Sequence, residues 1–357
     1  MDAQAFRAQF PVLERIAYLN SGTDGPLPAA AVEAGRRELE AEGRDGRITA
    51  HFERRMALQD ELRAGYGRVV GAPADQIALT TSATDGIARV VAGLGLGEGD
   101  EVLTSDQEHP GVTGPLLSAR RRGVHVRVVP LADLATAVGP ETRLVVASHV
   151  SWVGGELAPA ALAELSVPVI LDGAQGAGAV PVDVKGLNCV AYAAAGQKWL
   201  CGADGTGFLW IDPGFAERVS LVSAGYMNFA DASQGLDGEF KDTAQRFDTP
   251  SLAREMVATS LAALTLLESA GWDTVHARAA ALARRFADAL RERGCALAPR
   301  GNTTLVSWRE EDDEAVRDRL AGAGVVIRNL PGRGLLRASV GAWNDESDLE
   351  RLLSALG

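Results

Sequence analysis

The sequence is poor in the residues that metal sites and disulfide frameworks require. It has three cysteines and five histidines, and neither set shows the spacing of metal ligands. The cysteines, Cys189, Cys201 and Cys295, are odd in number and far apart, which argues against a disulfide framework and for a reducing compartment. We therefore expect no bound metal and a cytoplasmic protein.

Long hydrophobic runs and an excess of positive charge are also missing. No apolar segment approaches the length of a membrane-spanning helix, and no signal peptide opens the chain. The formal net charge of −12 argues against nucleic acid and anionic membranes as partners, because both attract clustered Lys and Arg. The negative net charge does not exclude an anionic small molecule as ligand, since a binding site needs only a few local cations. We expect a soluble, intracellular protein whose partner is a small molecule.

The chain does have the length and the ordinary composition of a globular protein with two packed domains. It has 357 residues, of which 46% are hydrophobic and 23% charged. Strand-like apolar runs alternate with helical patterns up to about residue 250, which predicts an α/β domain with a mostly parallel sheet between helices. Two long helical runs and a mixture of short strands and helices follow. We predict a large domain over residues 16–250 and a small α+β C-terminal domain over residues 251–357, with residues 1–15 packed near the small domain.

The strands of the large domain are expected where short apolar runs are bounded by turn residues. They are 77–80, 101–104, 124–129, 144–147, 167–171 and 189–193. Two glycine-rich stretches, 93–99 and 202–207, match neither a dinucleotide-binding fingerprint nor a phosphate-binding P-loop, so we interpret both as turns.

A carboxylate and a lysine follow two of these strands. Asp172 ends the run 167–171, and Lys198 follows the run 189–193 after a short turn. Open α/β sheets bind ligands beyond the carboxyl ends of their strands, so both side chains should face one site. An amine that condenses with an aldehyde and a carboxylate that keeps a pyridine nitrogen protonated are what pyridoxal 5'-phosphate (PLP) chemistry requires. Taken singly, Asp172 could be a helix N-cap and Lys198 a solvated loop lysine.

Two further segments fit the same site. The segment 80–86 is a small polar turn before an amphipathic helix, and a helix N-terminus suits a phosphate, although the turn could also be an ordinary Ser or Thr cap. His109 follows the run 101–104, and its imidazole could lie flat on the cofactor ring or could be structural.

The order of these segments resembles the class V aminotransferase family of fold-type I PLP-dependent transferases, which includes cysteine desulfurases, selenocysteine lyases and isopenicillin N epimerase-like proteins. The resemblance runs from Tyr18 to the C-terminal helix. Its motifs are 82–86, Glu108-His109, Asp172-Gly-Ala-Gln175, Gly196-Gln-Lys198 and 246–251, of which the Asp-x-x-Gln and Gly-x-Lys pair is the most specific.

The resemblance implies a role for each matched residue. Lys198 would hold PLP as a Schiff base and move the α-proton, Asp172 would pair with the pyridine nitrogen, and His109 would stack on the ring. Gln175 would bind the phenolic oxygen. The backbone amides of Ala83 and Thr84 and the side chain of Gln197 would bind the phosphate. Arg337 would bind the substrate carboxylate, in a pocket near Asn20.

The family match of Thr249 implies a homodimer, because this threonine reaches the phosphate of the neighbouring subunit. The segment around Thr249 is shorter than in relatives, so the sequence does not decide whether Thr249 reaches the neighbouring subunit. Trp152 stands where desulfurases carry an asparagine.

The most important departure is that no cysteine lies between Arg328 and Arg337, where desulfurases place the thiol that takes up sulfur. We therefore expect an amino-acid lyase that expels a β-substituent, perhaps by C–S cleavage of a cysteine-derived substrate, without a persulfide cysteine. An epimerase or an aminotransferase is the alternative, because all three share the same first carbanion. A non-catalytic PLP-fold binding protein is a further alternative that intact Lys198 and Asp172 disfavour.

Overall fold

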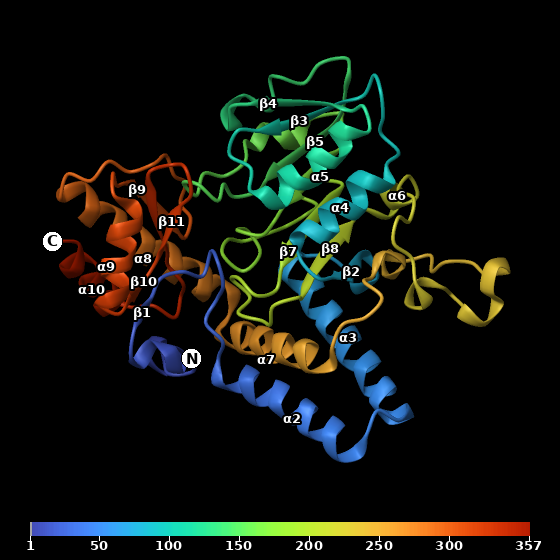
Figure 1. Cartoon of the computed structure of the whole chain (residues 1–357), viewed down its shortest axis with the longest axis horizontal. Coiled ribbons are helices and arrows are strands. Elements are labelled where there is room, and N and C mark those ends of the chain that lie inside the picture. The colour runs from blue at the N-terminus through green and yellow to red at the C-terminus, as the bar shows by residue number, and fades with distance from the viewer. Residues whose placement is uncertain (1) are drawn as a thin grey trace.

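A seven-stranded sheet forms the centre of the computed structural model, which describes residues 2–357 (Figure 1). In spatial order its strands are β2 (Ile77–Thr80), β8 (Gly207–Ile211), β7 (Ala191–Ala195), β6 (Val169–Asp172), β5 (Thr142–Ser148), β3 (Glu101–Ser105) and β4 (His125–Val129). Only β8 runs antiparallel to its neighbours. The other strands are parallel, so their carboxyl ends lie at one edge of the sheet.

Helices cover both faces of this sheet, which explains why its strands are apolar on both sides. One hydrophobic core joins the sheet to α3 (Thr49–Val70) and α7 (Arg254–Ala270). A second core joins the opposite face to α4 (Ala83–Gly93) and α5 (Pro110–Arg121). The helix α2 (Ala29–Asp45) packs along α7 outside the first core, as Figure 1 shows.

The C-terminal part of the chain forms its own sheet and core. The antiparallel sheet has the order β11-β12-β9, with β11 (Arg328–Leu330), β12 (Leu335–Ser339) and β9 (Leu305–Arg309). The strand β10 (Val325–Val326) pairs separately with β1 (Ala17–Tyr18). The helices of this part are α8 (Trp272–Glu292), α9 (Asp313–Gly322) and α10 (Glu346–Leu356), and they share one core with its sheet.

The N-terminal segment packs on this C-terminal unit. Its helix α1 (Ala3–Arg7) buries Phe6, and Arg7 forms an ion pair of 2.6 Å with Asp348. The bounds of the two domains, placed at residue 250, stay a prediction.

The fold-type I α/β architecture predicted from the sequence is confirmed, but several elements have no counterpart in the sequence prediction. The longest of them are α3, which has 22 residues, and the antiparallel strand β8. The short helix α6 (Pro213–Ala216) follows β8. Within residues 2–357, no helix is both long and apolar enough to cross a membrane.

Candidate active site

Lys198 and Asp172 come together at the carboxyl edge of the large sheet. Asp172 is the last residue of β6, and Lys198 lies three residues beyond the end of the neighbouring strand β7. The parallel pairing of Asp172 with Ala193 fixes the two strand ends side by side. The two side chains are close enough for their charges to interact, and Lys198 has no hydrogen bond or ion pair to another side chain within residues 2–357.

The environment of Lys198 makes its amine easier to deprotonate. Burial lowers the pKa of Lys198 to about 8, Arg337 and Arg328 add to this shift, and Asp172 and Asp24 oppose it. Burial raises the pKa of Asp172, while Lys198 opposes that rise. A lysine with a pKa near neutrality has a substantial fraction of free amine, which is the form that attacks an aldehyde.

The turn after Asp172 is shaped by two buried side chains that the sequence reasoning missed. The Tyr192 ring packs so closely on Gly173 that a Cβ there would lie 2.0 Å from a ring carbon. The Tyr192 hydroxyl lies 3.0 Å from Nδ1 of His149, whose own backbone N–H donates to the Asp172 carbonyl at 2.9 Å. Asp172 Oδ1 also accepts from the Ala174 N–H at 2.9 Å, so the same side chain caps the turn and faces the site.

His109 caps α5 and is held in its neutral form. Its Nδ1 accepts a hydrogen bond from the Gly111 N–H at 3.0 Å, which leaves the proton on Nε2. Burial lowers the pKa of His109 to about 4, with the cations of Lys198, Arg328 and Arg337 adding to the shift. A neutral imidazole suits a residue that stacks on an aromatic ring.

Glu108, directly before His109, ties the ends of two strands together. Its carboxyl group accepts from the Ser148 hydroxyl and backbone N–H, at 2.6 and 3.1 Å, and from the Ser105 hydroxyl at 2.5 Å. Burial raises the pKa of Glu108 to about 7. Because Ser105 ends β3 and Ser148 ends β5, this carboxyl group holds the segment that presents His109. No pattern in the sequence indicated this role.

The N-terminus of α4 and the side chain of Gln197 fit a phosphate-bearing cofactor. Ser82 caps the helix and accepts from the Asp85 N–H, so the first turn that contains Ala83 and Thr84 presents backbone N–H groups. Gln197 has a buried Oε1 without a hydrogen-bond partner within residues 2–357. Because no partner fixes this oxygen, the Gln197 amide is free to turn its NH2 group, which is the donor that a phosphate needs, toward a ligand beside Lys198.

Two of the other predicted site residues are tied to the protein itself. Gln175 donates from Nε2 to the Gly22 carbonyl at 2.7 Å and accepts at Oε1 from Trp199 at 2.9 Å, so one N–H of its amide is left for a ligand. The Oδ1 atom of Asn20 accepts from Thr23 at 2.8 Å.

Thr249 lies at the opposite edge of the sheet from β4, where its backbone N–H donates to Leu79 in β2 at 2.8 Å. Its neighbour Asp248 forms a buried two-bond ion pair with Arg63, at 2.9 and 2.8 Å. This segment is therefore firmly attached to the sheet. Whether Thr249 meets another subunit stays a prediction.

Arg337 is fully buried and has no acidic partner in the part of the chain that the structure describes. Nη1 donates to the Trp152 carbonyl at 2.7 Å, while Nε and Nη2 have no partner within residues 2–357. A Cβ on Gly22 would lie 2.9 Å from Nη2 and 3.0 Å from Oε1 of Gln175, so Gly22 keeps the space beside both groups open. Burial lowers the pKa of Arg337 to about 9. Two free, converging N–H groups on a buried cation are suited to a carboxylate.

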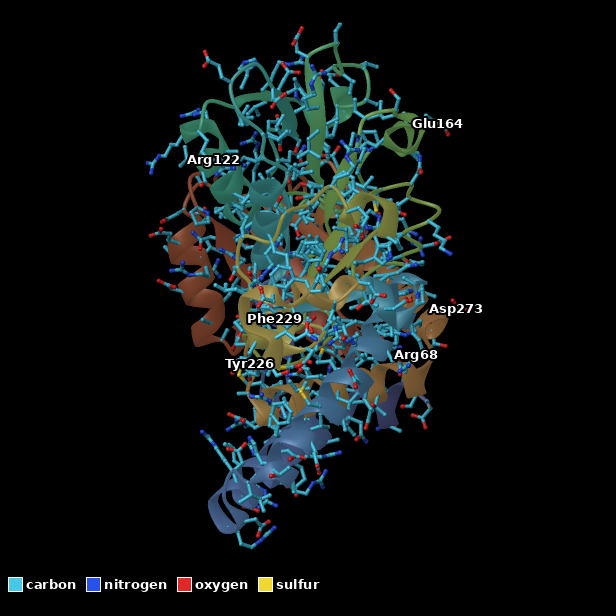
Figure 2. All side chains as sticks on the ribbon, turned by 90° about the vertical axis from the view of Figure 1, so that its right-hand side faces the viewer. Arg68, Arg122, Glu164, Tyr226, Phe229 and Asp273 are labelled. Carbon is cyan, nitrogen blue, oxygen red and sulfur yellow. The ribbon has the colours of Figure 1, made fainter. Side chains whose placement is uncertain are left out.

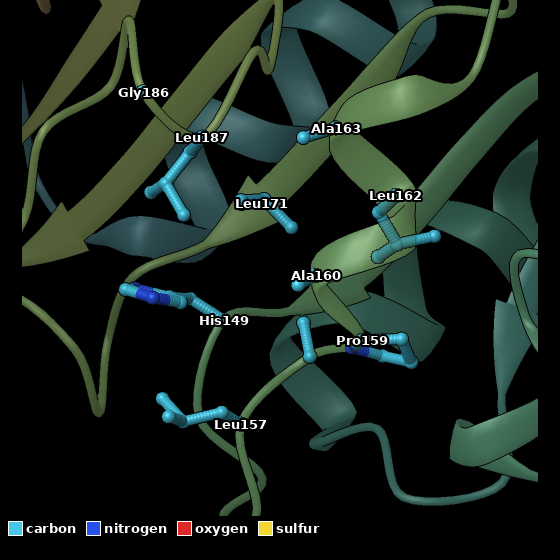
Figure 3. Close-up of a pocket in the computed structure, with 10 residues that line it drawn as sticks. His149, Leu157, Pro159, Ala160, Leu162, Ala163, Leu171, Gly186 and Leu187 are labelled. Carbon is cyan, nitrogen blue, oxygen red and sulfur yellow. The ribbon is translucent and has the colours of Figure 1, made fainter.

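An apolar cavity of about 230 Å³ lies beside His149 (Figure 3). Its lining includes Leu157, Leu162, Leu171 and Leu187 but not Lys198, Asp172 or Arg337. We assign it no part in the chemistry.

Comparisons with known proteins identify the family of the chain. A family model described as Aminotransferase class-V matches residues 17–352. An isopenicillin N epimerase of Amycolatopsis lactamdurans is 29% identical, over 98% of this chain and 96% of its own. A probable cysteine desulfurase of Pseudomonas aeruginosa is 32% identical, over 98% and 96%.

Among solved structures, the cystine C–S lyase C-DES, in complex with its reaction product cysteine persulfide, superimposes with a TM-score of 0.92. It is 27% identical, over 98% of this chain and 99% of its own. A variant of C-DES carries glycine covalently linked to its PLP cofactor. With the fit of the site around Lys198, these likenesses make PLP the cofactor of this protein. The chain belongs to the class V aminotransferase family of PLP-dependent, fold-type I enzymes.

Proposed function

We propose that this enzyme eliminates a β-substituent from an amino acid, by cleavage of the C–S bond of a cysteine-derived substrate, without a thiol of its own. The observation that carries the proposal is the combination of a half-buried Lys198 beside Asp172, an Arg337 with two unpaired guanidinium nitrogens, and the absence of a cysteine from the hairpin between Arg328 and Arg337. The likeness to a cystine C–S lyase supports it.

Each residue has a defined task in this proposal. PLP supplies an aldehyde for the amine of Lys198 and a ring that accepts electrons from the substrate α-carbon. Asp172 keeps the ring nitrogen protonated, and neutral His109 covers one face of the ring. Arg337 fixes the substrate carboxylate, so that the α-hydrogen faces the freed amine of Lys198. Lys198 then takes the α-proton and returns a proton later, while the β-substituent leaves with its bonding electrons.

The three thiols are poorly suited to a sulfur relay. Burial raises the pKa of Cys189 to about 12 and that of Cys201 well above its ordinary value, so neither supplies a thiolate at neutral pH. Cys295 packs against the core of the C-terminal unit, away from Lys198. A relay through a persulfide on the protein needs an accessible thiolate, whereas β-elimination needs none.

Product analysis tests the proposal. Purified protein with bound PLP should convert L-cystine or an S-substituted L-cysteine to pyruvate, and the Cys295→Ala and Cys201→Ala variants should retain this activity. Lys198→Ala should be inactive, while Lys185→Ala, which changes an exposed lysine, should behave as the unmodified protein does. A cysteine variant that loses sulfur release while it still binds substrate would refute elimination without a thiol.

The epimerase is the second candidate, and the near full-length likeness to isopenicillin N epimerase favours it. Substrate that is racemised without keto acid would establish this reaction, and accumulation of pyridoxamine phosphate would indicate an aminotransferase. A protein that stays colourless with added PLP would instead support a non-catalytic binding role. We further propose a homodimer with Thr249 near the partner's cofactor. Sedimentation equilibrium tests the dimer, and weaker PLP binding by Thr249→Ala in a protein that is still dimeric tests the position of Thr249.

A further inference from the structure

Trp152 stands at the centre of a group of cations at the active site. Its ring lies 5.0 Å from the ring of His109, edge to face, and its carbonyl accepts from Nη1 of Arg337. The guanidinium carbons of Arg333 and Arg328 lie over the Trp152 ring, 5.5 and 6.0 Å from its centre. Trp152 therefore joins the predicted carboxylate clamp to two further arginines.

Neither Arg328 nor Arg333 has an ion pair within residues 2–357. Arg328 donates weakly to the Asn329 carbonyl at 3.2 Å and to the Thr23 hydroxyl at 3.3 Å, and Arg333 donates to the Asp106 carbonyl at 3.4 Å. Asp24 is the carboxylate that acts on Arg328, but it lies beyond ion-pair distance and also acts on Lys198. Both guanidinium groups are half-buried, so their charges are only partly screened by water.

The buried arginines other than Arg337 are paired with acids. Arg63, Arg89 and Arg254 each have a carboxylate partner within 3 Å, whereas the half-buried Arg278 and Arg300 donate to backbone carbonyls, which Arg328 and Arg333 do only at 3.2 Å and beyond. The chain has a net charge of −12, so carboxylates are in excess. A shortage of carboxylates therefore does not explain why Arg328 and Arg333 lack an acidic partner beside Trp152. The indole Nε1 of Trp152 is also buried without a hydrogen-bond partner within residues 2–357.

We propose that Arg328 and Arg333, stacked on Trp152, bind a second carboxylate on the side chain of the substrate. The substrate class is then a cysteine derivative whose sulfur substituent carries a carboxylate, held at its α-carboxylate by Arg337 and at its distal carboxylate by the other two arginines. Planar guanidinium groups that rest on an aromatic ring are pre-organised for such a bond. This inference rests on the proposed function, because it names the substrate of the same site.

The test is a binding measurement that needs no turnover. The holoprotein is titrated with L-glutamate and with L-glutamine, and with L-aspartate and L-asparagine, while the visible absorbance of bound PLP is followed. Each pair has nearly the same shape and differs in the charge of the side chain. We expect the acidic member to bind about tenfold or more tightly, as a charge-assisted hydrogen bond in a partly buried site would provide.

Variants then locate the discriminating groups. Arg328→Gln and Arg333→Gln should each reduce the preference for the acid several-fold, and the double variant should abolish it, while affinity for the amides stays within about twofold. Arg121→Gln is the matched control, because Arg121 ends α5 about 18 Å along the helix from His109 and is exposed. Figure 2 shows its neighbour Arg122 at the periphery of the molecule. The control should keep the full preference.

The outcomes separate this inference from the proposed function. Equal affinity for acid and amide, or a preference that survives the double variant, overturns the second carboxylate and leaves the amino-acid enzyme intact. Absence of any spectral change with all four amino acids and with S-substituted cysteines would overturn the proposed function itself.

Discussion

Replacing Arg337 by methionine should stabilise the apoprotein while it removes substrate affinity. Arg337 is a fully buried cation without an acidic partner within residues 2–357, and burial lowers its pKa by more than three units to about 9. At 1.36 kcal/mol per pKa unit, keeping it charged in the folded state costs about 5 kcal/mol. Since the folded pKa lies below the unfolded one, this cost is fully present at every pH below about 9.

The substitution also removes one favourable bond. The hydrogen bond from Arg337 to the Trp152 carbonyl is lost, and a charged hydrogen bond contributes about 1.5 to 3 kcal/mol. Methionine fills a similar volume and is flexible enough to adapt to the cavity. The net expectation is a gain of roughly 2 to 3.5 kcal/mol in the free energy of unfolding, in line with other buried charges replaced by apolar side chains.

Arg63 provides the matched comparison, since it is equally buried but is paired with Asp248 through two hydrogen bonds. Arg63→Met leaves Asp248 buried and unpaired, so it should destabilise the apoprotein by about 3 to 5 kcal/mol. Urea unfolding of both apoprotein variants at pH 7, followed by tryptophan fluorescence, measures the two effects. Loss of stability in Arg337→Met as large as in Arg63→Met would refute the view that Arg337 is retained for a ligand.

Three further predictions concern the cofactor and substrate sites. Burial lowers the pKa of Lys198 to about 8, so the rate at which apoprotein takes up PLP should rise as the pH passes through about 8 and level off above it. Stopped-flow absorbance measures this rate, and a rate independent of pH would contradict the lowered pKa of Lys198. Gly22→Ala places a methyl group 2.9 Å from Nη2 of Arg337, so PLP absorbance should persist while amino-acid affinity falls at least about tenfold. Unchanged affinity would mean that the substrate carboxylate binds away from Arg337. Asp172→Asn should lower turnover by roughly two orders of magnitude with PLP still bound, and full activity would exclude the pairing with the ring nitrogen.

Much of the large domain was predictable because buried parallel strands are continuous apolar runs. The run 77–80 coincides with β2, and the other predicted strands of the large sheet overlap β3 to β7 with shifts of a few residues at their ends. The position of Lys198 and Asp172 at one edge followed from the same rule, since each follows a strand. Motif order then brought in His109 and Arg337.

The elements that the sequence prediction lacked have physical reasons. The helix α3 mixes charged and apolar residues with little separation into faces, so its period is weak, although it buries Leu62 and Tyr66 against the sheet. The strand β8 begins at the end of the glycine-rich stretch 202–207, and the glycines obscure the apolar run that would predict a strand there. The support of Asp172 by Tyr192 and His149 depends on contacts between residues of three neighbouring strands and their connections, which no local pattern encodes.

The most direct test of the account is to find which lysine carries PLP. The chain has three lysines, Lys185, Lys198 and Lys241, so borohydride reduction of the yellow holoprotein followed by peptide mapping gives an unambiguous answer. The account predicts that the reduced cofactor is attached to Lys198 alone and that Lys198→Ala carries no covalent label. A label on Lys185 or Lys241, or none on a holoprotein that still absorbs as PLP, would contradict it.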